Sequence, residues 1–139
     1  MLNPFRALLL AAALGVATPA LAESSNLSAA QQAIAGQIAA FKAKDGAKAY
    51  SYAAPNVKRF FPSTDAFMSM VRSGYQPVFD PQDYSFGRVN EADGTIYQEV
   101  YVTGPRGKDW VALYTLEVQG DGTWLITSCR IAEHNATSI

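Results

Sequence analysis

The sequence predicts an α+β domain in which three N-terminal helices pack on a curved antiparallel sheet of about four strands. In the first half, apolar residues recur at helical spacing, as Ile34, Ile38 and Phe41 do at i, i+4 and i+7. In the second half, three glycine-containing turns separate segments rich in Val, Ile, Tyr and Trp. Helices followed by a run of antiparallel strands are typical of the α+β class.

The first helix is expected to start at the capping-box pattern Ser28-Ala29-Ala30-Gln31. We place a flexible leader and the helix start in residues 23–33 and a single folded domain in residues 34–132. Residues 133–139 follow the last expected strand and are interpreted as a frayed tail, because chain ends without packing partners are poorly ordered.

Two further helices are expected before the sheet. Asp45 has the position of an N-cap for a short helix over residues 47–53. Residues 57–61 add a turn of packing contacts, and a third helix is expected over residues 63–73, with Gly74 as its terminating C′ glycine.

The remaining chain is typical of strands. Residues 75–79 are expected to form a short edge strand interrupted by Pro77. Turns at residues 92–94, 104–107 and 120–122 then divide the chain. The four expected strands of the meander cover residues 84–90, 95–103, 108–119 and 123–132.

The third of these strands carries apolar residues on both faces. Trp110, Ala112 and Tyr114 share one face, whereas Val111 and Leu113 lie on the other. One face should therefore take the helices, while the other could take a partner subunit or line a concavity.

The first 22 residues have the pattern of a cleavable signal peptide. Arg6 supplies a positive charge, residues 7–16 are an unbroken apolar run, and an A-x-A site ends at Ala22. The apolar run is about half the length needed to span a bilayer, so a retained membrane anchor is not expected. We expect cleavage before Glu23 and a periplasmic or secreted mature protein.

Charge and cysteine content exclude several function classes. The chain has 11 Lys plus Arg and 12 Asp plus Glu residues, and the basic residues are scattered, so nucleic acid is not an expected partner. One cysteine, Cys129, cannot form an intramolecular disulfide and is interpreted as a buried structural thiol. One histidine and one cysteine cannot make a zinc site, and no metal or cofactor is predicted.

Several short sequence motifs occur together along the chain. They are Ile38-x-x-Phe41-x-x-x-Asp45-Gly46, Ala49-Tyr50-x-x-Ala53-x-Pro55, Phe67-Met68-x-Met70-Val71-x-x-Gly74-Tyr75-x-Pro77-Val78, Trp110-x-Ala112-Leu113-Tyr114 and Asp121-Gly122-x-Trp124-x-Ile126-x-x-Cys129. Together, over residues 34–131, they resemble the uncharacterised bacterial proteins grouped as domain of unknown function 4864. The resemblance implies exported proteins with an α+β cone similar to the nuclear-transport-factor-two-like fold. It implies no activity and no catalytic residues.

No catalytic residue is assigned from the sequence. His134 falls in the expected tail, where exposure to solvent is its simplest role. A tyrosine offers a large apolar face and a hydroxyl that needs a partner, so tyrosines lead the candidates for a ligand pocket. Core packing explains the same residues equally well. The full set of pocket candidates is Tyr50, Phe67, Met70, Tyr75, Glu99, Trp110 and Tyr114.

Three functions remain open at this level. The preferred one is a non-catalytic module of the cell envelope that binds a small ligand or an envelope protein. The second is an isomerase or lyase that uses Glu99 or Asp45 together with a tyrosine hydroxyl. The third is a structural homodimer formed through the outer sheet face.

Overall fold

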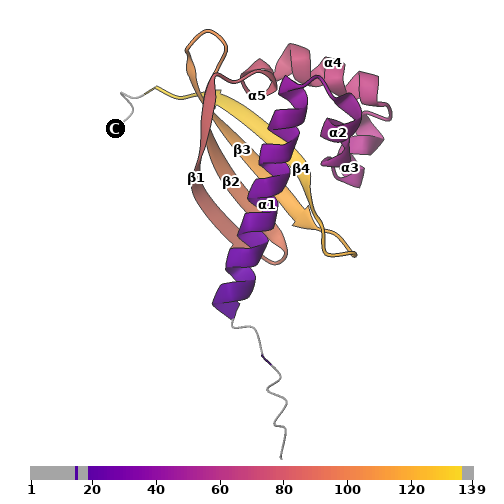
Figure 1. Cartoon of the computed structure of the whole chain (residues 1–139), viewed down its shortest axis with the longest axis vertical. Coiled ribbons are helices and arrows are strands. Elements are labelled where there is room, and N and C mark those ends of the chain that lie inside the picture. Colours follow the sequence, from indigo (N-terminus) through magenta and orange to yellow (C-terminus); the bar gives the residue numbers. More distant parts are fainter. Residues whose placement is uncertain (1–14, 16–18, 136–139) are drawn as a thin grey trace, which may run out of the picture.

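Helices occupy the first half of the described chain and strands the second half, as the sequence predicts (Figure 1). The computed structural model describes Gly15 and residues 19–135. These residues form an α+β fold whose elements are α1 (Pro19–Lys42), α2 (Gly46–Ser51), α3 (Pro55–Phe60), α4 (Thr64–Gly74), α5 (Gln76–Phe79), β1 (Asp83–Ala92), β2 (Thr95–Thr103), β3 (Asp109–Val118) and β4 (Trp124–Glu133).

The four strands form one antiparallel meander in the order β1-β2-β3-β4. Each strand is rich in β-formers, and glycine-containing turns separate each strand from the next. Between β1 and β2, both Asp93 and Gly94 have positive φ angles, 50° and 76°, which is the geometry that a two-residue hairpin requires. The predicted strands are confirmed to within two residues at each end.

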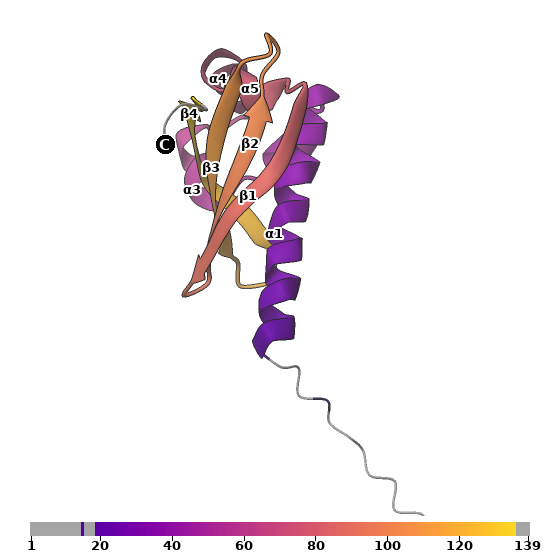
Figure 2. The ribbon, with the colours of Figure 1, turned by 90° about the vertical axis from the view of Figure 1, so that its left-hand side faces the viewer.

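The described helices pack against one face of this sheet, and Figure 2 shows α1 running alongside the strands, on their right. The inner face of β2 presents Ile96, Val100 and Val102, all of which are buried. Helix α1 packs on the inner face of the sheet with Ile34 and Ile38. Short alanine side chains at other positions of α1 allow the helix to approach the sheet closely.

A buried glutamine joins α1 to the sheet. Gln98 on β2 is fully buried, and its Oε1 accepts a hydrogen bond of 3.0 Å from Gln31 of α1. Its Nε2 donates to the backbone oxygens of Gly87, Arg88 and Glu99 at 3.3, 3.3 and 2.8 Å. Gly87 and Arg88 lie where the register of β1 shifts, so this amide satisfies carbonyls that a β-bulge leaves without ladder partners.

The start of α1 differs from the sequence prediction. The helix begins at Pro19, so the residues before Ser28, which were expected to precede the helix, are helical as well. Proline suits the first helical position, and the Ala-rich stretch after it contains no helix breaker. The first buried side chain is Ala30, so the packed part of α1 still begins close to the predicted start. The predicted signal segment lies outside the described residues except for Gly15 and residues 19–22.

The helical region is also divided more finely than predicted. Residues 57–61 belong mostly to a separate helix, α3, and the edge strand predicted over residues 75–79 is wrong because this segment forms α5. Gly74 is the last residue of α4 and has no positive φ angle, so it is not a C′ glycine. Pro77 occupies an early position in α5, where its missing N–H costs nothing.

The end of the chain is more ordered than predicted as far as the structure describes it. Glu133 pairs with Trp110 as the last residue of β4, and the backbone N–H of His134 donates to Asp109 at 3.0 Å. The ring of His134 lies 5.5 Å from that of Tyr101. Among the helices of the described residues, none has the length and apolar character that crossing a membrane requires.

We predict that Gln98→Leu lowers the free energy of unfolding by about 2 kcal/mol, because it leaves partly buried carbonyls and the amide of Gln31 without partners. Urea denaturation monitored by circular dichroism measures the change. Gln32→Leu, on the exposed side of α1, is the matched control and should change stability by less than about 0.5 kcal/mol. Equal effects of the two substitutions would contradict this role for Gln98.

Candidate functional site

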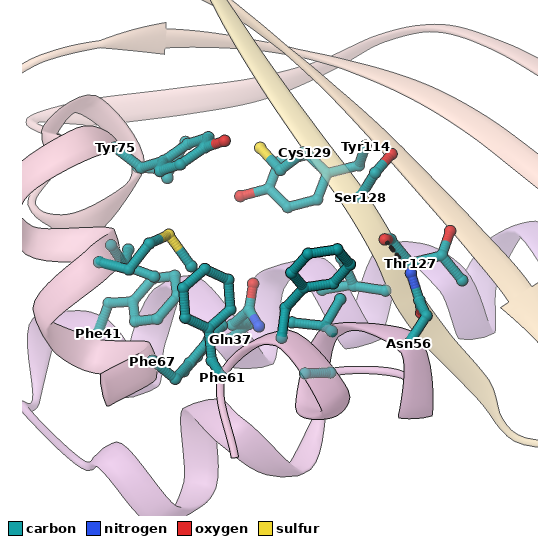
Figure 3. A pocket seen from close by; sticks show the side chains of 17 residues that line it. Gln37, Phe41, Asn56, Phe61, Phe67, Tyr75, Tyr114, Thr127, Ser128 and Cys129 are labelled. Atoms are coloured by element: carbon teal, nitrogen blue, oxygen red, sulfur yellow. Dashed lines mark hydrogen bonds between the residues drawn. The ribbon is translucent and has the colours of Figure 1, made fainter. Parts of the chain in front are cut away.

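A cavity of about 360 Å³ lies between the inner face of the sheet and the short helices (Figure 3). Most of its lining side chains are aliphatic or aromatic. The lining residues are Gln37, Phe41, Ala53, Asn56, Val57, Phe60, Phe61, Phe67, Met70, Val71, Tyr75, Val78, Tyr114, Ile126, Thr127, Ser128 and Cys129.

The cavity lies between two separate clusters of buried residues. The sheet cluster contains the inner-face residues together with Ala30–Ile38 of α1, and it contributes Tyr114 and Ile126 to the lining. The helix cluster joins the end of α1 to α2, α4 and α5, and it contributes Phe41 and Phe67. Helix α1 therefore belongs to both clusters along its length, and the cavity opens where the two diverge.

Aromatic packing holds the helical wall of the cavity. The ring of Phe41 lies 6.1 Å from that of Phe67 and 5.8 Å from that of Phe79. Tyr50 packs on Phe67 from behind, with 5.5 Å between the ring centres. The hydroxyl of Tyr50 donates to the carbonyl of Phe61 at 2.7 Å. This bond fixes the segment between α3 and α4, and Phe61 lines the cavity.

A bulge in β4 forms the opposite wall. The register shifts so that Thr115 pairs with Ser128 and Leu116 with Ile126, which leaves Thr127 as the extra residue. The carbonyl of Thr127 accepts a hydrogen bond of 2.9 Å from Asn56 of α3. The bulge therefore places α3 over the edge of the sheet.

The connection between α2 and α3 continues this attachment to β4. The N–H of Ala54 donates to the carbonyl of Ile126 at 2.8 Å, and the N–H of Ile126 donates to the carbonyl of Tyr52 at 2.9 Å. The edge of β4 is thus partly paired by the chain itself, which protects it from pairing with other strands.

Three polar groups face the same part of the cavity. Figure 3 shows the hydroxyls of Tyr75 and Tyr114 and the thiol of Cys129 directed toward one another. Tyr114 is only 1% exposed, and its hydroxyl has no hydrogen-bond partner of acceptable geometry among the described residues. A buried hydroxyl without a partner is costly, so this atom is an unusual feature of the core.

Burial keeps these groups protonated. It raises the pKa of Tyr114 well above its ordinary value, and the neighbouring thiol of Cys129 raises this pKa further. Burial also raises the pKa of Cys129 to about 12, and the nearby hydroxyl of Tyr114 opposes this rise only in part. Both groups are uncharged at neutral pH, so the site offers O–H and S–H donors and no thiolate nucleophile.

No charged side chain of the described chain lines this cavity. Gln37 is buried, and its amide nitrogen is already used to donate to the carbonyl of Ala49 at 3.2 Å. The amide of Asn56 is likewise used by Thr127. Within the described residues, no group of three or more His, Cys, Asp or Glu side chains could hold a metal ion.

Four of the predicted pocket residues come together in the cavity: Phe67, Met70, Tyr75 and Tyr114. Tyr50 does not line it but supports its wall from behind. The lining residues Asn56, Phe61 and Thr127 were not predicted. Their roles depend on the β4 bulge and on the position of α3, and neither feature leaves a signal in the local sequence.

The predictions that Glu99 and Trp110 line this pocket are wrong. Glu99 lies on the outer face, where Arg88 donates to its two oxygens at 3.0 and 3.1 Å. These hydrogen bonds are the main cause of a lowered pKa for Glu99. Trp110 lies at the far end of the sheet beside a separate hollow of about 270 Å³, which Tyr101 and His134 also line.

Asp45 is not part of the cavity either. Its side chain accepts a hydrogen bond of 3.1 Å from the backbone N–H of Lys48, which confirms its predicted role as the N-cap of α2.

The fold and site define this protein as an α+β domain with an apolar cavity between its helices and its sheet. The chain belongs to the family described as domain of unknown function (DUF4864), whose model matches residues 23–139. No significant match was found among curated proteins or solved structures. The similarity to a nuclear-transport-factor-two-like cone therefore stays a prediction.

We predict that the thiol of Cys129 reacts with iodoacetamide at pH 8 about a thousandfold more slowly in the folded protein than in urea, because little of it is thiolate. The folded-state rate should rise about tenfold per pH unit between pH 8 and 10. The reaction rate of an ordinary thiol instead levels off above its pKa of about 8.5. Mass spectrometry of quenched samples follows the reaction. A folded-state rate within tenfold of that in urea would contradict the raised pKa.

Proposed function

We propose that this protein is a non-catalytic module that binds a small, largely apolar ligand in the cavity between its helices and sheet. The cavity itself is the observation that carries the proposal. Its volume of about 360 Å³ falls at the lower end of the range of roughly 300–1,000 Å³ found for small-molecule sites. Such sites are typically lined by hydrophobic and aromatic side chains with a few polar groups, as this cavity is.

The order of the surrounding chain supports the same proposal. Two hydrogen bonds fix the walls: Tyr50 donates to the carbonyl of Phe61, and Asn56 donates to the carbonyl of Thr127. A site whose walls are held in place before binding loses less conformational entropy when a ligand enters.

We place this activity in the cell envelope or outside the cell. The support is the predicted signal peptide, with its apolar run and its A-x-A site ending at Ala22. The family match begins at Glu23, the residue that follows the predicted cleavage site. The region matched by the family model and the predicted mature protein thus begin at the same residue.

The geometry gives no support to the isomerase or lyase hypothesis in the form stated from the sequence. That hypothesis requires Glu99 or Asp45 to share a cavity with a tyrosine hydroxyl. Glu99 is paired with Arg88 on the outer face, and Asp45 caps α2. The tyrosine hydroxyls of the cavity therefore lack the acid that this chemistry needs.

We predict that Met70→Trp abolishes the binding of the neutral fluorescent probe N-phenyl-1-naphthylamine, because the larger side chain fills part of the cavity. Fluorescence titration measures binding, and circular dichroism checks that the variant is folded. Val89→Trp is the matched control, because Val89 is exposed on β1 away from the cavity and should leave binding unchanged. If wild type and Met70→Trp bind the probe equally, the cavity is not the site.

A homodimer formed through the outer sheet face is a second candidate function. The described helices leave this face uncovered, and Tyr97, Tyr101 and Leu113 are 42%, 36% and 36% exposed on it (Figure 2). Clustered apolar side chains of this kind often mark interfaces. The face also carries the Arg88–Glu99 ion pair, so it is mixed in character.

If this face holds a second copy, wild type should be a dimer in size-exclusion chromatography with light scattering, and Leu113→Glu should be a monomer. The reason is that a carboxylate at the centre of an interface loses its hydration. Val118→Glu is the control, because Val118 is similarly exposed but lies at the end of β3. A wild-type monomer at all concentrations would exclude this candidate.

A further inference from the structure

We propose that the ligand of this cavity is an uncharged molecule whose carbonyl oxygen accepts a hydrogen bond from the hydroxyl of Tyr114. This inference rests on the proposed function, because it specifies the chemistry of the molecule that the cavity binds. It is carried by the unpartnered hydroxyl, by the donors beside it and by the absence of charge from the lining of the described cavity.

The hydroxyl of Tyr114 is the strongest indication. Its oxygen is buried from solvent and makes no hydrogen bond of acceptable geometry with the described residues, although almost every buried polar atom in a folded protein has a partner. The thiol of Cys129 lies close enough to affect its pKa, but a thiol is only a weak hydrogen-bonding group. Tyr114 is a member of the sheet cluster and also lines the cavity. A ligand atom at this position would supply the missing partner.

The neighbouring groups determine which ligand atom fits. The hydroxyl of Tyr75 and the thiol of Cys129 are directed to the same place as the hydroxyl of Tyr114 (Figure 3). Burial raises the pKa of both Tyr114 and Cys129, so each keeps its proton to donate. A carbonyl oxygen has two lone pairs and no proton, so it can accept from two such donors at once.

The lining of the described cavity has no partner for a charged ligand group. The nearby cations of the helical region are placed elsewhere: Lys58 lies over the ring of Tyr50 at 5.0 Å, and Arg72 lies over the ring of Phe79 at 5.7 Å. Neither cation lines the cavity. A carboxylate or ammonium group would lose its hydration on entry without gaining a counter-ion, which is strongly unfavourable.

Three probes that share one ring system test this inference: 2-acetylnaphthalene, which has a carbonyl, 2-isopropylnaphthalene, which has none, and 2-naphthoate, which is an anion. Isothermal titration calorimetry on the full folded protein measures each dissociation constant. We expect the ketone to bind about fivefold more tightly than the hydrocarbon, the ratio that one net hydrogen bond provides. We expect the anion to bind most weakly.

Two variants assign the preference to one hydroxyl. Tyr114→Phe removes the donor and should make the ketone and the hydrocarbon bind equally, while hydrocarbon binding stays at its wild-type level. Tyr97→Phe is the matched control, because Tyr97 is exposed on the outer sheet face and does not line the cavity. It should keep the fivefold preference. Tyr114→Phe should fold as stably as wild type, since the hydroxyl that it removes has no partner.

The outcomes separate this inference from the function on which it rests. If no probe binds to wild type, the proposed function fails. If the hydrocarbon binds but the ketone shows no preference that Tyr114→Phe removes, the cavity is a ligand site and the inference about its ligand is wrong. Tightest binding of 2-naphthoate would also overturn the inference.

Discussion

The structure depends on how one long helix divides its packing between two cores. Over residues 30–38, α1 covers the apolar inner face of the sheet, and at Ala40 and Phe41 it packs instead against the short helices. A single helix cannot cover a sheet of four strands, so the short helices must cover the rest. The two sets of contacts separate beside β4, and the cavity is the space between them.

Two irregularities in the sheet set the shape of this space. The bulge in β1 is stabilised by the amide of Gln98, which also contacts α1 through Gln31. The bulge in β4 carries Thr127, which holds α3 through Asn56. Bulges increase the local twist and bend of a strand. The bulge in β1 therefore anchors α1, and the bulge in β4 positions α3 beside the cavity.

The chemistry inside the cavity follows from burial. Desolvation keeps the hydroxyl of Tyr114 and the thiol of Cys129 uncharged, and none of the described acidic or basic side chains enters the space. Hydrogen bonds in such surroundings are stronger than in water, and an unmade one is correspondingly costly. Selectivity can then come from a single hydrogen bond within an otherwise apolar site.

Local patterns were sufficient to predict the sheet but not the cavity. The strands were predictable because alternation and turn glycines act over a few residues, as at Gly94. The segment containing Pro77 was mistaken for a strand, because Pro77 is equally compatible with the first turn of a helix. Tyr75 and Tyr114 were predictable as pocket residues from their amphipathic side chains. The misplacement of Glu99 and Trp110 followed from assigning residues to a site before the packing of α1 was known.

Native mass spectrometry of the protein isolated from the cells that make it tests the central claim most directly. The account predicts one small uncharged molecule per chain, which is released on denaturation and is absent from the Met70→Trp variant prepared in the same way. A small molecule that both proteins retain equally, or a retained molecule that is an anion, would contradict the account.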